Sequence, residues 1–201
     1  MNKVLVVVDM QNDFITGSLG TKEAQAIVPN VVAKIKQAQA DDVHVVVTQD
    51  THGTDYLSTY EGRHLPVIHC VEGTKGWQLK PSVRAAVDAA YKKEDKNARA
   101  ELLSVYKHSF GSDKVTDTIG SYIGFAHDHK EPIEVEFVGL CTGICVLSNA
   151  ILAKARFPEA TISVDASCCA CVTPQSHDTA LAAMKLCQIE IKNQGKEPWR
   201  K

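Results

Sequence analysis

Four polar side chains in this chain have the types that nucleophilic chemistry at a carbonyl carbon requires: Asp9, Asp50, Lys107 and Cys145. A cysteine thiolate can attack such a carbon. A carboxylate can take the thiol proton and later give it to a leaving amine. We therefore interpret Cys145 as a candidate nucleophile, Asp9 as its proton acceptor, and Lys107 as the cation that holds both electrostatically.

The surroundings of Cys145 favour this role. The residue stands where a loop with Gly139 and Gly143 becomes a helical pattern, and glycine permits the close turns of such a loop. Because a helix N-terminus and a nearby lysine lower a thiol pKa, we expect a lowered pKa for Cys145. Backbone N–H groups between Cys141 and Cys145 are candidates for an oxyanion hole.

Each of these residues also has a structural interpretation. Cys145 can be a buried core thiol, Asp9 a cap or turn residue, and Lys107 a solvated surface residue. A redox pair of Cys141 and Cys145 is a weaker alternative, since three residues separate them instead of the two of a thioredoxin-like motif. The other cysteines include a cluster after the last predicted strand, which we expect in the core or at a subunit contact: Cys168, Cys169 and Cys171.

A possible metal site lies in residues 50–69, which hold three histidines and three acids. Asp50 and His52 can reach one ion from an extended loop, and further ligands would come from Glu61, His64 or His69. Mixed nitrogen and oxygen donors suit Zn, Mn or Fe. No fixed metal-motif spacing is met, so a histidine-rich surface loop explains the spacing equally well.

The elements that must position these side chains alternate along the chain. Apolar runs predict strands at residues 4–8, 43–47, 102–106, 135–138 and 161–164, and helical periodicity covers residues 24–40, 82–91, 145–155 and 175–187. This order predicts an α/β fold: a doubly wound, mostly parallel sheet with helices on both faces. Ligands of such sheets bind beyond the carboxyl ends of the strands, where the four polar residues fall.

Length and composition restrict the class of protein. The 201 residues fit one domain, 1–201, with a candidate metal-site and substrate-lid loop at 50–76. The formal net charge of -2 without a basic stripe argues against a nucleic-acid partner. The apolar run at residues 4–8 is too short for a signal peptide or a membrane span. We therefore expect a cytoplasmic protein without membrane contact, and a homo-oligomer.

The chain resembles the nicotinamidase/pyrazinamidase branch of the isochorismatase-like cysteine hydrolase superfamily. Matching segments occur in family order: Val8-Asp9-Met10-Gln11-Asn12-Asp13-Phe14, Thr48-Gln49-Asp50-Thr51-His52, Leu65-Pro66-Val67-Ile68-His69-Cys70-Val71-Glu72-Gly73-Thr74, Tyr106-Lys107-His108-Ser109-Phe110 and Val138-Gly139-Leu140-Cys141-Thr142-Gly143-Ile144-Cys145-Val146. The Asp, Lys and Cys segments are specific to the superfamily as a set. The Asp-x-His and His-Cys-x-x-Gly-Thr segments point to this branch.

The resemblance implies a metal-dependent amidase that hydrolyses nicotinamide, or pyrazinamide, to the acid and ammonia through a thioester on Cys145. It implies a catalytic triad with Asp9 and Lys107, and oxyanion contacts from the amides of Cys141 and Cys145. A cis peptide is expected between Leu140 and Cys141. The remaining implied site residues contact the substrate ring or hold a divalent metal, Zn first and Mn or Fe next: Phe14 and Leu140 for the substrate; Asp50, His52, Glu61 and His69 for the metal.

Some positions depart from the family pattern. No histidine follows His52 before Glu61, so Glu61 takes the extra ligand position with His64 as its competitor. The Trp that usually precedes the Pro-x-His stretch in the family is missing here, and Leu65 stands in its vicinity. Trp77 is a candidate to supply the stacking surface instead. Gly143-Ile144 replaces an Asp-His pair, without an expected effect on the nucleophile. The alternative functions are a metal-free isochorismatase-like hydrolase of another small amide or vinyl ether, and a thiol redox or sensor protein.

Overall fold

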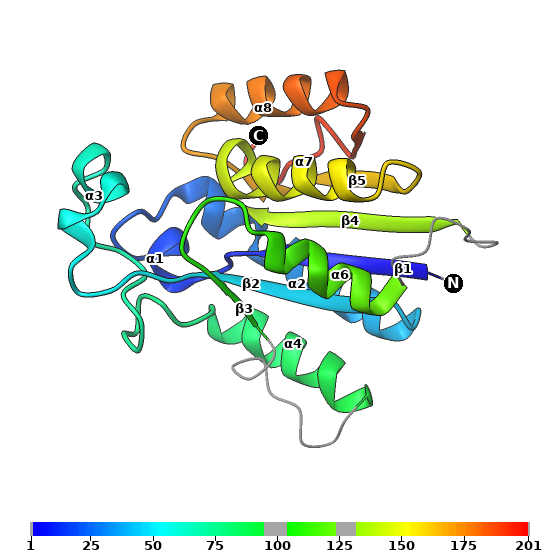
Figure 1. The fold of residues 1–201 in the computed structure, drawn as a ribbon, viewed down its shortest axis with the longest axis horizontal. Coiled ribbons are helices and arrows are strands. Elements are labelled where there is room, and N and C mark those ends of the chain that lie inside the picture. The colour runs from blue at the N-terminus through cyan, green and yellow to red at the C-terminus, as the bar shows by residue number, and fades with distance from the viewer. Residues whose placement is uncertain (1, 95–103, 124–131, 201) are drawn as a thin grey trace.

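The centre of the molecule is a parallel sheet of six strands in the order β3-β2-β1-β4-β5-β6 (Figure 1). The computed structural model describes residues 2–94, 104–123 and 132–200. The strands are β1 (Asn2–Val8), β2 (His44–Asp50), β3 (Val105–Lys107), β4 (Ile133–Leu140), β5 (Thr161–Ala170) and β6 (Glu190–Lys192). The predicted doubly wound α/β class is confirmed.

Buried apolar strands form the middle of the sheet. Residues 4–8 of β1 are all buried, which is typical of a parallel strand covered on both faces. The strand pairs with β2 on one side and β4 on the other, with Val8 opposite Gly139. On the next pair outward, Asp50 of β2 lies opposite Lys107 of β3. The register therefore brings the predicted acid, lysine and cysteine segments to one edge.

Helices cover both faces of the sheet (Figure 1). On one face α1 (Asn12–Ile15), α2 (Lys22–Ala40) and α4 (Pro81–Glu94) enclose a core with Leu5 and Val7. On the other face α6 (Asp113–Ile123), α7 (Leu147–Arg156) and α8 (Pro174–Leu186) enclose a core with Val6 and Phe137. Among the described residues, no helix combines the length and apolar character that crossing a membrane requires.

The segments at the carboxyl end of the sheet are short and irregular. The connection after β2 contains the 3-10 turn η1 (Tyr56–Ser58) and the short helix α3 (Tyr60–His64). The connection after β4 is a π-helical turn, η2 (Thr142–Val146), which leads into α7. Loops that a rigid scaffold holds in this way are common places for chemistry.

Several element bounds differ from the prediction. β5 continues to Ala170 instead of ending at residue 164, so Cys168 and Cys169 lie within a strand, and β6 follows it as the last strand. Neighbouring strand residues point to opposite faces, and these two cysteines pack into different cores. Helix α6 was not predicted. Of the strand predicted at residues 102–106, residues 102 and 103 lie outside the described part of the chain.

Candidate active site

Asp9 lies directly after β1, fully buried, with a positive φ of 47°. Its backbone N–H donates to the Thr48 carbonyl at 3.3 Å, and the Thr48 hydroxyl donates to Oδ1 of Asp9 at 2.6 Å. The other carboxylate oxygen, Oδ2, lies 2.7 Å from Nζ of Lys107 and has no further partner among the described residues. This oxygen is the one available for proton transfer.

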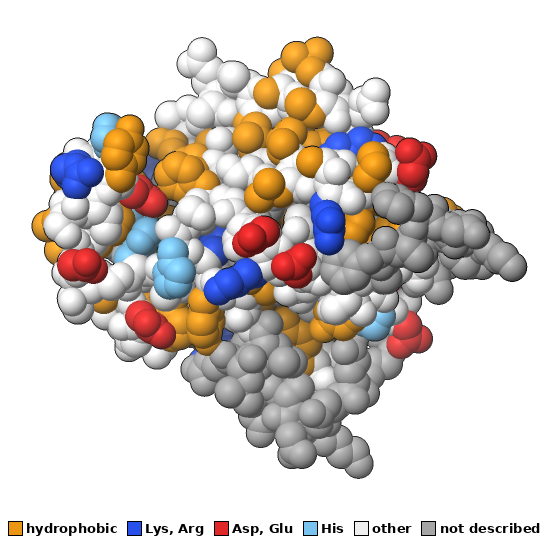
Figure 2. Space-filling view, in the orientation of Figure 1, with side chains coloured by type: hydrophobic (Ala, Val, Ile, Leu, Met, Phe, Trp, Pro, Cys, Tyr) orange, Lys and Arg blue, Asp and Glu red, His pale blue; other side chains and the backbone are white. Residues whose placement is uncertain are grey.

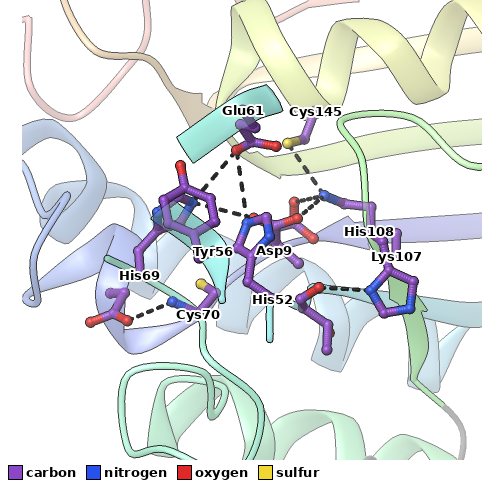
Figure 3. Close-up of polar contacts among 12 residues, drawn as sticks. Asp9, His52, Tyr56, Glu61, His69, Cys70, Lys107, His108 and Cys145 are labelled. Carbon is purple, nitrogen blue, oxygen red and sulfur yellow. Dashed lines mark hydrogen bonds and ion pairs between the residues drawn. The ribbon is translucent and has the colours of Figure 1, made fainter. Parts of the chain in front are cut away.

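Lys107 joins three predicted site residues through one buried ammonium group (Figure 3). Its Nζ lies 2.7 Å from Asp9, 3.2 Å from Oδ1 of Asp50 and 3.4 Å from Sγ of Cys145. The solvated surface lysine of the alternative interpretation is therefore wrong, since the side chain is 1% exposed. A buried cation between anions needs this kind of pairing.

The charges around Lys107 shift each other's pKa. Burial lowers the pKa of Lys107, but Asp9, Cys145 and Asp50 outweigh it and raise that pKa well above its usual value. Burial is also the main reason that the pKa of Asp9 is raised, against the opposing effect of Lys107. Lys107 therefore stays charged, and Asp9 is a better proton acceptor than an exposed carboxylate.

Cys145 does not have the lowered pKa that its sequence position suggested. Burial raises the pKa of this thiol well above its ordinary value, Asp9 raises it further, and Lys107 only partly offsets them. The expectation was wrong because desolvation of a 5% exposed thiolate exceeds the favourable charge nearby. The resting sulfur is a neutral thiol, so a base must take its proton before it can attack.

The turn that carries Cys145 begins at a cis peptide between Leu140 and Cys141, as expected. The Cys141 carbonyl accepts hydrogen bonds from the backbone N–H groups of Ile144 and Val146 at 3.0 and 3.1 Å. The amide of Asn149 donates to the Cys145 carbonyl at 2.8 Å. These bonds fix the path of the turn around the nucleophile. All seven cysteines are free thiols, Cys141 and Cys145 included.

Four side chains beside Lys107 can hold a metal ion: Asp50, His52, Glu61 and His69. One ligand atom from each lies within 4.8 Å of the others. Nε2 of His52 is 3.0 Å from Oδ2 of Asp50, and Nε2 of His69 is 3.5 Å from the same oxygen. Both rings approach Oε1 of Glu61, at 3.8 and 3.9 Å (Figure 3).

These distances and charges fit a divalent cation. Two atoms bound to one ion at about 2.1 Å can be at most about 4.2 Å apart. Four of the six pairs of ligand atoms, at 3.0 to 3.9 Å, meet this limit, and the cluster as a whole, whose atoms lie within 4.8 Å of one another, needs only a small contraction around an ion. Nδ1 of His69 lies 2.8 Å from the Val67 carbonyl and donates to it, which turns Nε2 toward the cluster. Burial lowers the pKa of His69, but its hydrogen bonds to Asp50 and Val67 outweigh burial and raise that pKa, so a metal ion would take the place of a proton on Nε2. Asp9, Asp50 and Glu61 face one lysine, which leaves an excess of negative charge.

The two acids of the cluster have pKa values shifted in opposite directions, starting with that of Glu61. Burial raises it, and the charge of Asp50 raises it further. For Asp50, burial acts upward too, but hydrogen bonds from His52 and His69 and the charge of Lys107 hold its pKa below the ordinary value. Asp50 is therefore the permanent anion of the cluster.

The structure separates the two competitors for the extra ligand position. His64 is exposed at the end of α3, its Nδ1 lies 2.8 Å from the Tyr60 carbonyl, and it is outside the ligand cluster that contains Glu61. Trp77 does not line the cavity above Cys145. Its indole N–H donates to the Thr51 hydroxyl at 2.9 Å from a buried position.

Several positioning residues were not predicted. The buried Gln11 amide donates to the carbonyls of Asp50 and Trp77 at 2.8 Å, and its oxygen accepts from the Asp50 N–H at 2.8 Å. Asp13 accepts from the Cys70 N–H at 2.8 Å and so holds the strand-like segment that presents His69. The sequence signal for both was their place directly after Asp9, in the segment that the family resemblance quoted.

A cavity of about 240 Å³ lies over Cys145. Its walls are mostly apolar, with Phe14, Leu140 and Ile144 around the nucleophile, and its polar end holds Asp50, Glu61 and His69. The ring of Phe14 also contacts that of His69, with centroids 5.5 Å apart. Drug-sized ligands occupy cavities of about 300 Å³ or more, so this one suits a smaller molecule.

A second opening reaches the metal-ligand cluster from outside. It is lined by His52, Glu61, His64 and His108, beside α3. Figure 2 shows histidine side chains at the surface between the α3 segment and the body of the molecule. The cluster is therefore accessible to small solutes without passage over Cys145.

Comparison with known proteins shows the family of the chain. A family model for the isochorismatase domain matches residues 3–115, which include Asp9, Asp50 and Lys107. The chain belongs to the isochorismatase family, and the predicted resemblance is confirmed. The chain is also similar to the nicotinamidase/pyrazinamidase of Mycobacterium tuberculosis, at 26% identity over 193 residues that cover 94% of this chain and 97% of that protein.

Solved structures share the fold. A nicotinamidase/pyrazinamidase from Bacillus subtilis matches with a TM-score of 0.77 and 23% identity, covering 96% of this chain and 100% of that one. A pyrazinamidase from Pyrococcus horikoshii, solved in complex with zinc, matches with a TM-score of 0.71 and 22% identity over 95% and 98% of the two chains.

Proposed function

We propose that this chain is a nicotinamidase that hydrolyses nicotinamide, or a close analogue such as pyrazinamide, through a thioester on Cys145. The observation that carries the proposal is the convergence on Lys107. One buried ammonium contacts the candidate nucleophile, the candidate base and an acid of the metal-ligand cluster. The small apolar cavity above them and the curated relatives support an aromatic amide as substrate.

The first step is removal of the thiol proton. Oδ2 of Asp9 takes the proton from Sγ of Cys145 while Nζ of Lys107, in contact with both groups, stabilises the thiolate. Burial raises the pKa of both the Cys145 thiol and the Asp9 carboxyl. Both groups therefore hold a proton more tightly than they would in water. The transfer is therefore less unfavourable than the thiol pKa alone suggests.

Attack and hydrolysis follow. Sγ of Cys145 attacks the carboxamide carbon, and the backbone N–H groups of Cys141 and Cys145 face the developing oxyanion. Asp9 gives its proton to the departing ammonia, and a thioester remains. Asp9 then takes a proton from water, which attacks the thioester, releases the carboxylic acid and restores the thiol. In total, one amide and one water are consumed, and one carboxylic acid and one ammonia are formed.

Asp50, His52, Glu61 and His69 would hold the metal ion, with Zn favoured by the donor set. A bound divalent ion supplies a Lewis acid that can take a ring nitrogen and so orient the amide. The residues of this chain supply the rest of the binding: Phe14 and Leu140 confine the ring beside Cys145.

The test is ammonia release from nicotinamide by the wild type and by C145A. We expect C145A to abolish turnover with its zinc content unchanged, because Cys145 is outside the ligand cluster. C187A is the matched control, since Cys187 is an exposed thiol remote from these contacts, and it should keep wild-type activity.

Wild-type-like ammonia release by C145A would end the proposal. Activity that survives complete chelation, verified by elemental analysis, would instead favour the metal-free hydrolase of the same family. Loss of activity on mild oxidation, with a reversible disulfide and no ammonia release at any stage, would favour the thiol redox alternative.

A further inference from the structure

The C-terminal segment, residues 193–200, contains a buried acid that the reaction above does not use. Glu197 is 3% exposed, although it follows an exposed turn and stands four residues from the end of the chain. Its carboxylate forms an ion pair with Arg200, which also pairs with Asp178 at the start of α8. The ring of Trp199 lies edge-on to that of His177, with centroids 5.1 Å apart, and its indole N–H donates to the Cys169 carbonyl at 3.4 Å.

A buried hydrogen-bond chain runs from Glu197 to the turn that carries the nucleophile. Oε1 of Glu197 lies 3.3 Å from Nε2 of His177, and Nδ1 of His177 lies 2.8 Å from the hydroxyl of Thr142. Thr142 and His177 are both fully buried. Thr142 directly follows Cys141, the candidate oxyanion donor, and begins the π-helical turn.

The protonation states of the side chains determine which atom donates in each of these hydrogen bonds. Burial lowers the pKa of His177, so its ring is neutral and has one donor and one acceptor. Burial acts to raise the pKa of Glu197, but backbone N–H groups and Arg200 hold it below its ordinary value, so it is an ionised acceptor. Nε2 of His177 therefore donates to Glu197, and the Thr142 hydroxyl donates to Nδ1.

The turn has further contacts besides this chain of hydrogen bonds. The Cys141 carbonyl accepts from two backbone N–H groups, as described above. A Cβ added at Gly143 would lie 3.3 Å from the Cβ of Ala180, so the turn packs closely on α8. The Thr142 hydroxyl is the side-chain contact that joins the turn to His177 of the same helix.

We propose that the C-terminal segment positions the candidate oxyanion turn, with Glu197 orienting His177 and His177 holding Thr142 next to Cys141. These three are positioning residues, because none of them lines the cavity above Cys145. Their effect on turnover rests on the proposed amidase function. Their effect on the order of the turn does not.

Two pairs of variants in the full-length protein separate the hydrogen bonds from the bulk of the side chains. T142V and E197A remove a donor and an acceptor, whereas T142S and E197Q keep them. K196A is the control on the same segment, since Lys196 is exposed. The measurements are amide hydrogen exchange of a peptide covering residues 141–146, and kcat and KM for nicotinamide.

We expect T142V and E197A to speed exchange of that peptide about tenfold, because the turn loses its tether and opens locally more often. The same variants should lower kcat about tenfold with KM within twofold, because displaced oxyanion donors affect the transition state more than substrate binding. T142S, E197Q and K196A should stay within threefold of the wild type in both measurements.

Unchanged exchange in T142V and E197A would overturn the proposal, as would unchanged kcat in variants whose turn exchanges faster. Equal losses in T142S and T142V would also overturn it, because the hydroxyl would then be irrelevant. If the wild type releases no ammonia from nicotinamide, the proposed function fails, and the exchange comparison still decides whether the side chains of Glu197 and Thr142 order the turn.

Discussion

Lys107 combines two demands in one side chain. It is among the largest fully buried side chains, yet it carries a charge that water would otherwise solvate. Asp9 and Asp50 replace that solvation with contacts of 2.7 and 3.2 Å. The same two carboxylates depend on Lys107, because each would otherwise be a buried anion beside another. Stability and catalysis therefore respond differently to substitution of the cation and of the acid.

We predict that K107M unfolds more easily than D9N. K107M leaves two buried carboxylates facing each other without their cation and should cost about 3–5 kcal/mol. D9N keeps the pair between Lys107 and Asp50, so its cost should be about 1–3 kcal/mol. Urea unfolding of the metal-free proteins measures both.

Both variants should lower turnover at least about 100-fold, since D9N removes the proton acceptor and K107M the stabilising cation. Equal destabilisation by the two substitutions would contradict the idea that Lys107 neutralises both acids.

The sequence predicted the reactive residues of the site better than the residues that hold them in position. Asp9, Lys107 and Cys145 each follow an apolar run, and that common position identified them. Thr48 and Gln11 were missed because their partners are 39 residues or more away in the chain. The pKa of Cys145 was predicted with the wrong sign because the degree of burial depends on tertiary packing that no local pattern contains.

Helix α2 and strand β5 meet through a charged contact. Nζ of Lys34 lies 2.6 Å from Oδ2 of Asp165 and 3.1 Å from Glu136. Burial opposes the charge of Asp165, but hydrogen bonds from Lys34, Ser167 and Asn193 outweigh it and lower its pKa below the ordinary value. Lys34, Ser167 and Asn193 all donate hydrogen bonds to Asp165, so the contact requires an ionised carboxylate at this position.

The lowered pKa gives D165N a pH-dependent effect. An acid whose pKa falls on folding adds stability above its unfolded pKa, near 3.8, and loses it as the pH drops through the folded value. We predict that D165N costs about 1–3 kcal/mol at pH 7, because its NH₂ group would face donors.

The difference between D165N and the wild type should shrink steadily as the pH is lowered from 5 toward 2. Urea unfolding at several pH values measures it. A constant difference over this range would show that the carboxylate charge does not stabilise the contact between α2 and β5.

Strands and helices with a clear apolar pattern were the ones that the sequence predicted. β1, β2 and β4 were found within a few residues because buried parallel strands are continuous apolar runs. The second half of β5 was missed because Ser167, Cys168 and Cys169 are not strong strand formers. β6 has three residues with one apolar side chain, too few for a pattern. For α6 the signal existed, since Val115, Ile119 and Ile123 recur at four-residue spacing.

For the whole molecule, the candidate metal site predicts a link between zinc and thermal stability. An ion that binds only the folded chain adds about 2.7 kcal/mol at 100 times its Kd. For a domain of this size that corresponds to a rise in Tm of about 5–10 °C. E61A should show a smaller rise at the same zinc concentration, whereas H64A on the same short helix should match the wild type.

Differential scanning calorimetry with and without chelator measures these shifts. Loss of the zinc effect in H64A, with E61A unaffected, would reverse the assignment of the fourth ligand. Absence of any zinc effect in the wild type would contradict the metal site itself.

The central place of β1 has a consequence for synthesis on the ribosome. Among the six strands of the sheet β1 is made first, but its register partner β4 begins 131 residues later, with Asn2 opposite Ile133. At about 5–20 residues per second, one edge of this valine-rich strand stays unpaired for roughly 7–26 s until its neighbour is made. An unpaired apolar edge is a template for association with other chains. During that interval the nascent chain depends on its surroundings, for example on chaperones, to keep β1 apart from other polypeptides.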